Sequence, residues 1–276
     1  MTPPNDDGQD LTRKERRDQA RTERKAAEEA HAANAARRAR LTQLGAVVGV
    51  VIVAIVVILV ATGGGSKTSH TTGGAHTKES LKQQSEVSSL VGGIEQKGNI
   101  LGKETAPVTL AYFGDLECPF CREFTLKALP TIIQKYVRTG KLRLEYRSLE
   151  TATREPEVFR TQQVAALAAG KQNKMWDYVE LFYHEQGEED SGYVTEEYLH
   201  NLASQVSGLN ISKWSSDRQD NALANQIQED AQLANQQGFT GTPSFLIGHT
   251  GGAMQKLEPS SLTDASAFEP TIEKLI

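Results

Sequence analysis

Hydrophobic and polar positions divide the chain into segments of very different character. From residue 44 to 61 the sequence reads LGAVVGVVIVAIVVILVA, with no charged or strongly polar side chain. Eighteen helical residues span roughly 27 Å, which is close to the thickness of the hydrocarbon layer of a bilayer. A soluble helix is seldom apolar on every face over that length. The pattern therefore predicts one transmembrane helix over 44–61.

Residues 1–43 hold ten Lys or Arg and eight Asp or Glu among many alanines, which predicts a basic segment that is helical or disordered. Basic residues are more frequent before the apolar run than after it, so the N-terminus is predicted to be cytoplasmic and residues beyond 62 extracytoplasmic. A cleaved signal peptide is the alternative. A signal peptide normally has a short polar start, whereas residues 1–43 precede the apolar run here. This difference favours an uncleaved, single-pass anchor in the cell membrane.

Residues 62–94 are rich in Gly, Ser, Thr and Lys, with a weakly helical stretch, LKQQSEVSSLVGG, near their end. So little apolar surface predicts a flexible linker. Residues 95–276 are then long enough for one domain with its own core.

Within 95–276, an apolar run at 108–114 predicts a buried strand, and alternation over 141–149 predicts a second strand. Helical spacing predicts a helix over 119–138 and several helices between about 155 and 237. A strand over 244–247 and a helix near 265–276 end the chain. Helices thus fall between two strand-bearing ends, which indicates an α/β fold with a helical insertion at about 155–237.

Composition removes several classes of function. The chain has 30 Lys+Arg and 35 Asp+Glu, a formal net charge of −5, whereas a nucleic-acid-binding protein is normally basic. Its 2 cysteines cannot build a disulfide-rich scaffold or a four-cysteine zinc site.

Both cysteines lie in one motif, Cys118-Pro119-Phe120-Cys121, between a predicted strand and a predicted helix. Free N–H groups and the dipole at a helix N-terminus stabilise a thiolate, and Pro119 suits a first helical turn. We expect Cys118 to be the attacking thiolate and Cys121 to resolve the mixed disulfide.

Two other interpretations of the motif remain, a half zinc site and an inert pair. A zinc site needs two further ligands, and His184, His200 and His249 are scattered without ligand-like spacing. No metal is therefore predicted.

A second motif, Gly241-Thr242-Pro243-Ser244-Phe245, precedes the last apolar strand. With C-P-x-C in the same order, and with the stretches NILGKETAPVTLAYFGDLECPFC, KMWDYVELFYHEQ and QGFTGTPSFLIG, the sequence resembles the DsbA-like thiol–disulfide oxidoreductases of the thioredoxin superfamily. The fold expected is a thioredoxin-like α/β fold with a helical insertion, preceded by the transmembrane helix and the linker.

The resemblance implies that the Thr242–Pro243 bond is cis and faces Cys118, with Pro243 in the catalytic site. Backbone groups of Thr242 would pair with an extended substrate segment. Phe120 would add apolar surface for unfolded polypeptide. Phe113 and Phe245 would do the same or belong to the core.

The direction of electron flow depends on the residues around the two cysteines. The resemblance associates a histidine between them with strong oxidants, and here the position is Phe120. A carboxylate at Glu117 would disfavour the thiolate if it lies close. We therefore expect an oxidase milder than the most oxidising relatives. Asp115 or Glu117 is either a proton acceptor for Cys121 or an ordinary exposed acid.

No cofactor is expected beyond the Cys118–Cys121 disulfide. The predicted substrates are exported polypeptides with free cysteines. The resemblance suggests reoxidation by a quinone-linked membrane oxidoreductase of the DsbB or vitamin-K-epoxide-reductase type. Two alternatives stay open: a reductase that keeps extracytoplasmic thiols reduced, and a non-catalytic thioredoxin-like binding module.

Overall fold

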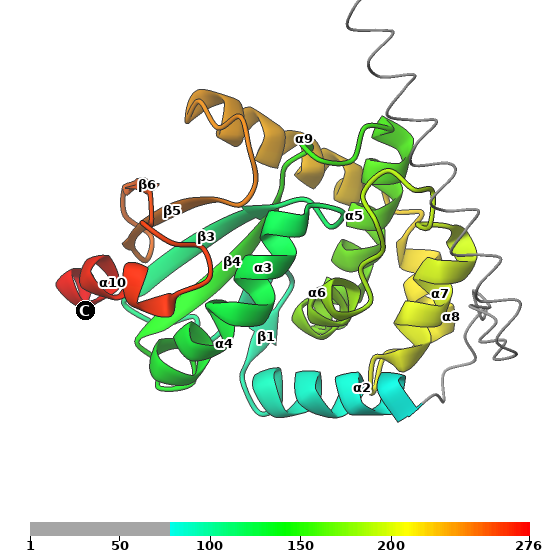
Figure 1. Cartoon of the computed structure of the whole chain (residues 1–276), viewed down its shortest axis with the longest axis horizontal. Helices are drawn as coiled ribbons and strands as arrows, with labels where there is room; N and C mark the ends of the chain where they lie inside the picture. The colour runs from blue at the N-terminus through cyan, green and yellow to red at the C-terminus, as the bar shows by residue number, and fades with distance from the viewer. Residues whose placement is uncertain (1–77) are drawn as a thin grey trace, which may run out of the picture. The chain divides into compact units, whose positions relative to one another are not determined.

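The computed structural model describes residues 78–276, so the predicted segments 1–43 and 44–61 lie outside the described residues. The described part is built on a six-stranded sheet in the order β1-β2-β4-β3-β5-β6 (Figure 1). Its strands are β1 (Gln96–Lys97), β2 (Ile100–Leu101), β3 (Val108–Gly114), β4 (Leu142–Ser148), β5 (Ser244–His249) and β6 (Met254–Leu257). Over residues 78–276 no helix has both the length and the apolar character needed to cross a bilayer.

Strand β3 lies at the centre of the sheet, parallel to β4 and antiparallel to β5. Side chains alternate between the two faces of a strand, so each face of β3 enters a different core. Leu110 and Tyr112 belong to the larger cluster, whereas Ala111 and Phe113 pack with Ala234 of α9 (Asn221–Gln236). Helices therefore cover both faces, and this explains why every residue of β3 is buried.

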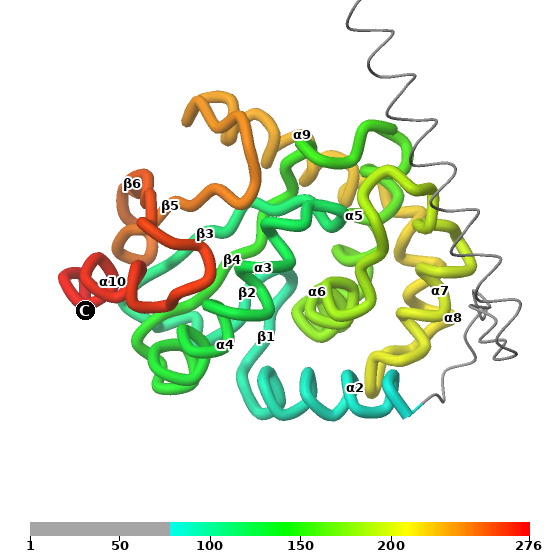
Figure 2. The backbone as a smooth tube through the Cα atoms, viewed as in Figure 1, coloured from blue at the N-terminus to red at the C-terminus, as the bar shows by residue number. Residues whose placement is uncertain are grey.

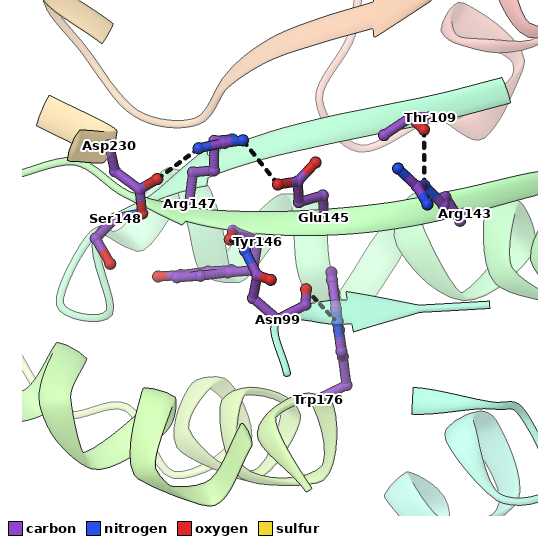
Figure 3. A network of polar contacts seen from close by, with 9 residues as sticks. All are labelled: Asn99, Thr109, Arg143, Glu145, Tyr146, Arg147, Ser148, Trp176 and Asp230. Carbon is purple, nitrogen blue, oxygen red and sulfur yellow. Dashed lines mark hydrogen bonds and ion pairs between the residues drawn. The ribbon is translucent and has the colours of Figure 1, made fainter. Parts of the chain in front are cut away.

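Strand β4 has the alternating burial that its sequence predicts. On the face towards α9, the Arg147 guanidinium bonds to Asp230 and to Glu145, each at 2.7 Å (Figure 3). The backbone N–H of Ser148 donates to the second Asp230 carboxylate oxygen at 2.9 Å. Burial raises the pKa of Asp230 to about 6, although the Ser148 N–H and Arg147 act against that rise. These bonds attach α9 to the end of β4.

The predicted helical insertion is confirmed between β4 and β5. The tube in Figure 2 runs from green through yellow to orange as the chain leaves β4, forms this helical region and returns beside β3. Its helices are α5 (Pro156–Gly170), α6 (Met175–His184), α7 (Glu196–Gln205), α8 (Ile211–Asp217) and α9. The helix predicted over 119–138 is divided into α3 (Pro119–Lys127), α4 (Leu129–Ile132) and the π-helical turn η1 (Ile133–Val137). The chain ends in η2 (Ala265–Ala267) and α10 (Glu269–Leu275).

The prediction of a flexible linker to residue 94 is wrong over its last part. Residues Lys78–Val91 form helix α2, which packs against α6 and η1. Val87 and Val91 are buried, which joins this helix to the main core. The guanidinium of Arg138 donates to the carbonyls of Ser89, Leu90 and Gly92, and so satisfies the free C=O groups at the end of α2. Residues 62–77 lie outside the described part.

Candidate active site

The two cysteines lie where the central strand leads into α3, as the sequence predicts. Cys118 is the N-cap residue of α3 in an extended conformation, and Pro119 occupies its first turn. The N–H of Arg122 donates to the Cys118 carbonyl at 3.1 Å, which begins the helical hydrogen-bond pattern. Cys118 is 4% exposed and Cys121 is fully buried. Only the first sulfur is therefore open to a reaction partner.

Hydrogen bonds lower the pKa of Cys118 to about 7. The largest contribution comes from the Cys121 thiol, and the Thr242 side chain and the backbone N–H groups of Cys121 and Phe120 add to it, while burial opposes them. The expected stabilisation by helix N–H groups is thus present but is one contribution among several. A thiolate is the reactive form of cysteine, so about half of this thiol is activated near neutral pH.

Cys121 differs from Cys118 in every respect that controls reactivity. Burial and the hydrogen bond to Cys118 raise the pKa of Cys121 well above its ordinary value. Both cysteines are free thiols in the structure. The pair therefore consists of one acidic thiol that is slightly exposed and one fully buried thiol that keeps its proton.

The Thr242–Pro243 peptide bond is cis, as the resemblance implies. It faces the first cysteine, because the Cys118 thiol donates to the Thr242 carbonyl at 3.3 Å. The Thr242 hydroxyl is also hydrogen-bonded to that of Thr151, at 2.6 Å, in the loop after β4. Three segments far apart in sequence thus meet at Cys118.

A groove of about 530 Å³ lies beside this loop and is lined in part by Phe120, Phe239, Pro243, Pro259 and Leu262. Phe120 is 63% exposed, so it offers the apolar surface expected of it. Phe113 and Phe245 are buried, which confirms the alternative that they belong to the core, and Phe245 also borders the groove.

The carboxylate of Asp115 organises the loop after β4. It accepts the N–H groups of Thr151, Ala152 and Thr153 at 2.9–3.0 Å and the Thr153 hydroxyl at 2.6 Å. The N–H of Glu117 donates to the same carboxylate at 3.1 Å. Asp115 is therefore buried and fully engaged, and the alternative of an ordinary exposed acid is wrong for it. Its role as a proton acceptor stays a prediction.

Glu117 is also buried, at 2% exposure, so it is not an exposed acid either. Burial raises the pKa of Glu117, a hydrogen bond from Thr153 opposes the rise, and the nearby Asp115 and Asp190 add to it. A carboxyl group with a raised pKa exchanges protons closer to neutrality than an ordinary glutamate does. Its role as proton acceptor also stays a prediction.

Sequence reasoning missed the hydrogen bonds that join α6 and the residues just after it to the cysteine loop and α3. The side-chain amide of Gln186, just after α6, donates to the carbonyls of Leu116 and Cys118 at 2.7 and 3.1 Å. Arg122 donates to the Tyr183 carbonyl at 2.9 Å. Only the resemblance of the stretch KMWDYVELFYHEQ pointed to this segment, because hydrogen bonds across so long a sequence separation leave no local pattern.

A further missed residue is Tyr112, whose hydroxyl lies under α3. It donates to the Tyr183 hydroxyl at 3.1 Å and lies 3.3 Å from that of Thr125. One sequence signal for it exists, a tyrosine in a largely apolar strand, because a buried phenol requires a hydrogen-bond partner.

The three histidines considered as metal ligands stay apart, since His184, His200 and His249 lie on α6, α7 and β5. Among residues 78–276 no three His, Cys, Asp or Glu side chains lie close enough together to hold a metal ion. That neither a metal nor a cofactor takes part stays a prediction.

A model of the family described as thioredoxin matches residues 95–262, which is more than half of the chain. The chain belongs to the thioredoxin family. Within this family it is similar to the "Probable disulfide bond formation protein D" of Bacillus anthracis, with 25% identity over 53% of this chain and 68% of that one. It is 24% identical to the "Disulfide bond formation protein D" of Bacillus subtilis, over 54% of this chain and 66% of that one.

Among solved structures, oxidised BdbD from Bacillus subtilis has the same fold, with a TM-score of 0.54 and 22% identity over 66% of this chain and 96% of that one. The resemblance to DsbA-like thiol–disulfide oxidoreductases is thereby confirmed. This member of the thioredoxin family is a protein disulfide oxidoreductase.

Proposed function

We propose that the protein is a membrane-anchored, extracytoplasmic oxidase that introduces disulfides into exported polypeptides. The observation that carries the proposal is the contrast between Cys118, which keeps 4% exposure and has a pKa of about 7, and the fully buried Cys121 beside it, next to an apolar groove. Such a contrast makes Cys118 the only sulfur that a substrate can reach. The names of the Bacillus relatives support the same direction.

In the oxidising direction, a substrate thiolate attacks the Cys118 sulfur of the Cys118–Cys121 disulfide. The bond between the two cysteines breaks, its electron pair goes to Cys121, and a mixed disulfide with Cys118 forms. A second substrate thiolate then attacks the substrate sulfur of that mixed disulfide. The substrate leaves with its own disulfide, and both cysteines remain reduced.

Substitution of Cys118 by Ser tests the proposed chemistry. The variant is expected to lose oxidation of a reduced, unfolded substrate protein completely, because the attacked sulfur is gone. Incubated instead with a substrate protein that already carries a disulfide, Cys121→Ser is expected to accumulate a mixed disulfide between Cys118 and that substrate, visible on a non-reducing gel, because no second cysteine is present to release it. Full oxidation by Cys118→Ser would contradict the proposal, and a retained biological role without exchange would favour the non-catalytic binding module.

The reductase is kept as a second candidate because a Cys118 pKa of about 7 is close to the value of thioredoxin, about 7, and far from the value of about 3.5 in the strongest oxidant. Equilibration of the cysteine pair with glutathione decides between them. An oxidase is expected well above about −270 mV, and a value near −270 mV would favour the reductase.

The proposed place of action rests on the apolar run 44–61 and on the basic residues before it. The full chain is expected to stay with membranes during alkaline extraction, whereas a chain that lacks 1–61 is expected in the soluble fraction. Release of the intact full chain would contradict the anchor.

For reoxidation we propose a quinone-linked membrane oxidoreductase of the DsbB or vitamin-K-epoxide-reductase type, which the DsbA-like relationship suggests. The reduced protein is expected to be reoxidised faster in membranes supplied with quinone than in quinone-depleted membranes. Equal rates would contradict this partner.

A further inference from the structure

Three tyrosines lie beneath the cysteine motif, contributed by three different elements. Tyr112 of β3, Tyr146 of β4 and Tyr183 of α6 are at most 1% exposed. The Tyr112 hydroxyl donates to that of Tyr183 at 3.1 Å, and the Tyr183 hydroxyl donates to the Asp115 carbonyl at 3.1 Å. The Tyr112 ring packs edge-on against that of Tyr146, with centroids 5.3 Å apart. Both the ring and the hydroxyl of Tyr112 are thus fixed.

The position of this hydroxyl relative to Cys121 follows from the geometry of α3. Thr125 lies four residues after Cys121, so the two side chains are on the same face of the helix, one turn apart. The Tyr112 hydroxyl is 3.3 Å from the Thr125 hydroxyl. Tyr112 is also among the groups that lower the pKa of Cys121, although the larger effect of burial outweighs them.

Cys121 requires a donor of this kind during exchange. When the Cys118–Cys121 bond breaks, the Cys121 sulfur receives the electron pair and becomes a thiolate. Cys121 is fully buried, so water cannot stabilise that charge. Asp115 and Glu117, the nearby carboxyl groups named above, are acceptors rather than donors when ionised. The backbone of Asp115 also lowers the pKa of Cys121, and the fixed phenolic hydroxyl of Tyr112 supplies a side-chain donor in addition.

We propose that Tyr112 is a catalytic residue, whose hydroxyl donates a hydrogen bond to the Cys121 sulfur as that atom leaves the disulfide, and that Tyr183 is its positioning residue. This inference rests on the proposed function, because it concerns the same exchange step. Tyr112 keeps its proton throughout, so the balance of the step is unchanged. One substrate thiolate is consumed, one sulfur–sulfur bond breaks, one forms, and the charge moves to Cys121.

The hydroxyl has one proton and two acceptors, and this gives it two arrangements. In the dithiol form it donates to Tyr183. When Cys121 carries the charge, it donates to that sulfur instead, and the Thr125 hydroxyl is placed to donate to the phenolic oxygen. The donor thus turns towards the charge when the charge forms.

Substitution Tyr112→Phe tests the proposal by removing the hydroxyl and keeping the ring. The measurement is the second-order rate constant for reduction of the Cys118–Cys121 disulfide by glutathione, in the otherwise intact chain. We expect the variant to be roughly ten- to a hundredfold slower, the usual effect of losing one hydrogen bond to a charged group. Tyr178→Phe is the matched control, because Tyr178 is an equally buried tyrosine that bonds to the Leu199 carbonyl instead. The control is expected to react at the wild-type rate.

A second measurement separates a catalytic role from a structural one. In a Cys121→Ala background, a mixed disulfide between Cys118 and glutathione is cleaved by dithiothreitol, and no charge develops at position 121. Tyr112→Phe is expected to leave this rate unchanged. If both reactions slow equally, Tyr112 is only structural and the proposal is overturned.

The remaining outcomes are also distinct. If the wild type does not exchange with glutathione, the proposed function fails. If the wild type exchanges and Tyr112→Phe matches it, only the present proposal fails. Should Tyr112→Phe not fold, Tyr183→Phe replaces it, with a two- to tenfold slower reduction expected, and a wild-type rate in that variant overturns the proposal.

Discussion

Only two residues separate Cys118 from Cys121, yet the fold shifts the pKa values of the two thiols in opposite directions. The C-P-x-C motif and the following helix predicted which of the two thiols would react, and the resemblance to DsbA-like proteins predicted that Pro243 would face Cys118. They could not reveal the hydroxyl of Tyr112 or the amide of Gln186, because these groups reach the site only through tertiary packing. A motif identifies the reacting atoms, whereas their surroundings depend on the whole fold.

Phe120 offers a direct test of how this site sets its acidity. Its N–H already favours the Cys118 thiolate, but its exposed ring carries no charge. Phe120→His would place an imidazolium beside the thiolate and is expected to lower the pKa of Cys118 from about 7 by roughly one unit. The disulfide should become more oxidising, because the reduced form is stabilised. Thiolate absorbance during a pH titration measures the shift.

The control is Phe120→Leu, which keeps the position apolar and is expected to leave the Cys118 pKa near its wild-type value. Superimposable titrations for the His and Leu variants would show that charge at position 120 does not reach the sulfur.

At the scale of elements, strands and helices with strong periodicity were predicted and those that depend on distant partners were not. Strand β4 is long enough to show alternation. Strands β1 and β2 contain only 2 residues each, and they exist because they pair with each other and with β4. Where helix α2 lies, only a weakly helical stretch within a linker was predicted, for a related reason. Its polar composition is that of a linker, and its few apolar residues become informative only when α6 and Arg138 are present.

The packing of α2 predicts a measurable contribution to stability. Val91 is 1% exposed at the end of this helix, so Val91→Ala is expected to lower the free energy of unfolding by about 2 kcal/mol. Urea unfolding provides the measurement. Leu81→Ala is the matched control on the same helix, because Leu81 is 50% exposed and its loss should change the free energy by less than about 0.5 kcal/mol. Equal effects of the two substitutions would mean that α2 is not part of the core.

At the scale of the whole molecule, one buried acid connects stability to pH. Glu180 of α6 is fully buried, and neither carboxylate oxygen has a hydrogen-bond partner within the described part of the chain. Burial, with a smaller effect from Asp177, raises the pKa of Glu180 from 4.5 to about 8. The folded state therefore binds one proton more than the unfolded state between these values, and stability must fall as pH rises through that window.

Glu180→Gln should remove this dependence. We expect the variant to match the wild type near pH 4.5 and to exceed it near pH 8 by on the order of 1–4 kcal/mol in unfolding free energy. Urea unfolding at several pH values measures the difference. Glu188→Gln is the control, because it removes one carboxyl group from an exposed position. Its unfolding free energy should follow that of the wild type at every pH. Parallel curves for Glu180→Gln and the wild type would show that this carboxyl is ionised in the folded protein.

The full burial of the Cys121 sulfur has a kinetic consequence. Because Cys118 is the only one of the two sulfurs with any exposure, the polypeptide substrate and the reoxidising protein of the oxidase proposed above would have to take turns at the same atom. No ternary complex can form there, and turnover must alternate between two half-reactions in the ping-pong manner. An excess of one reactant would then slow the cycle, because it would occupy the form of the enzyme with which the other reactant has to react.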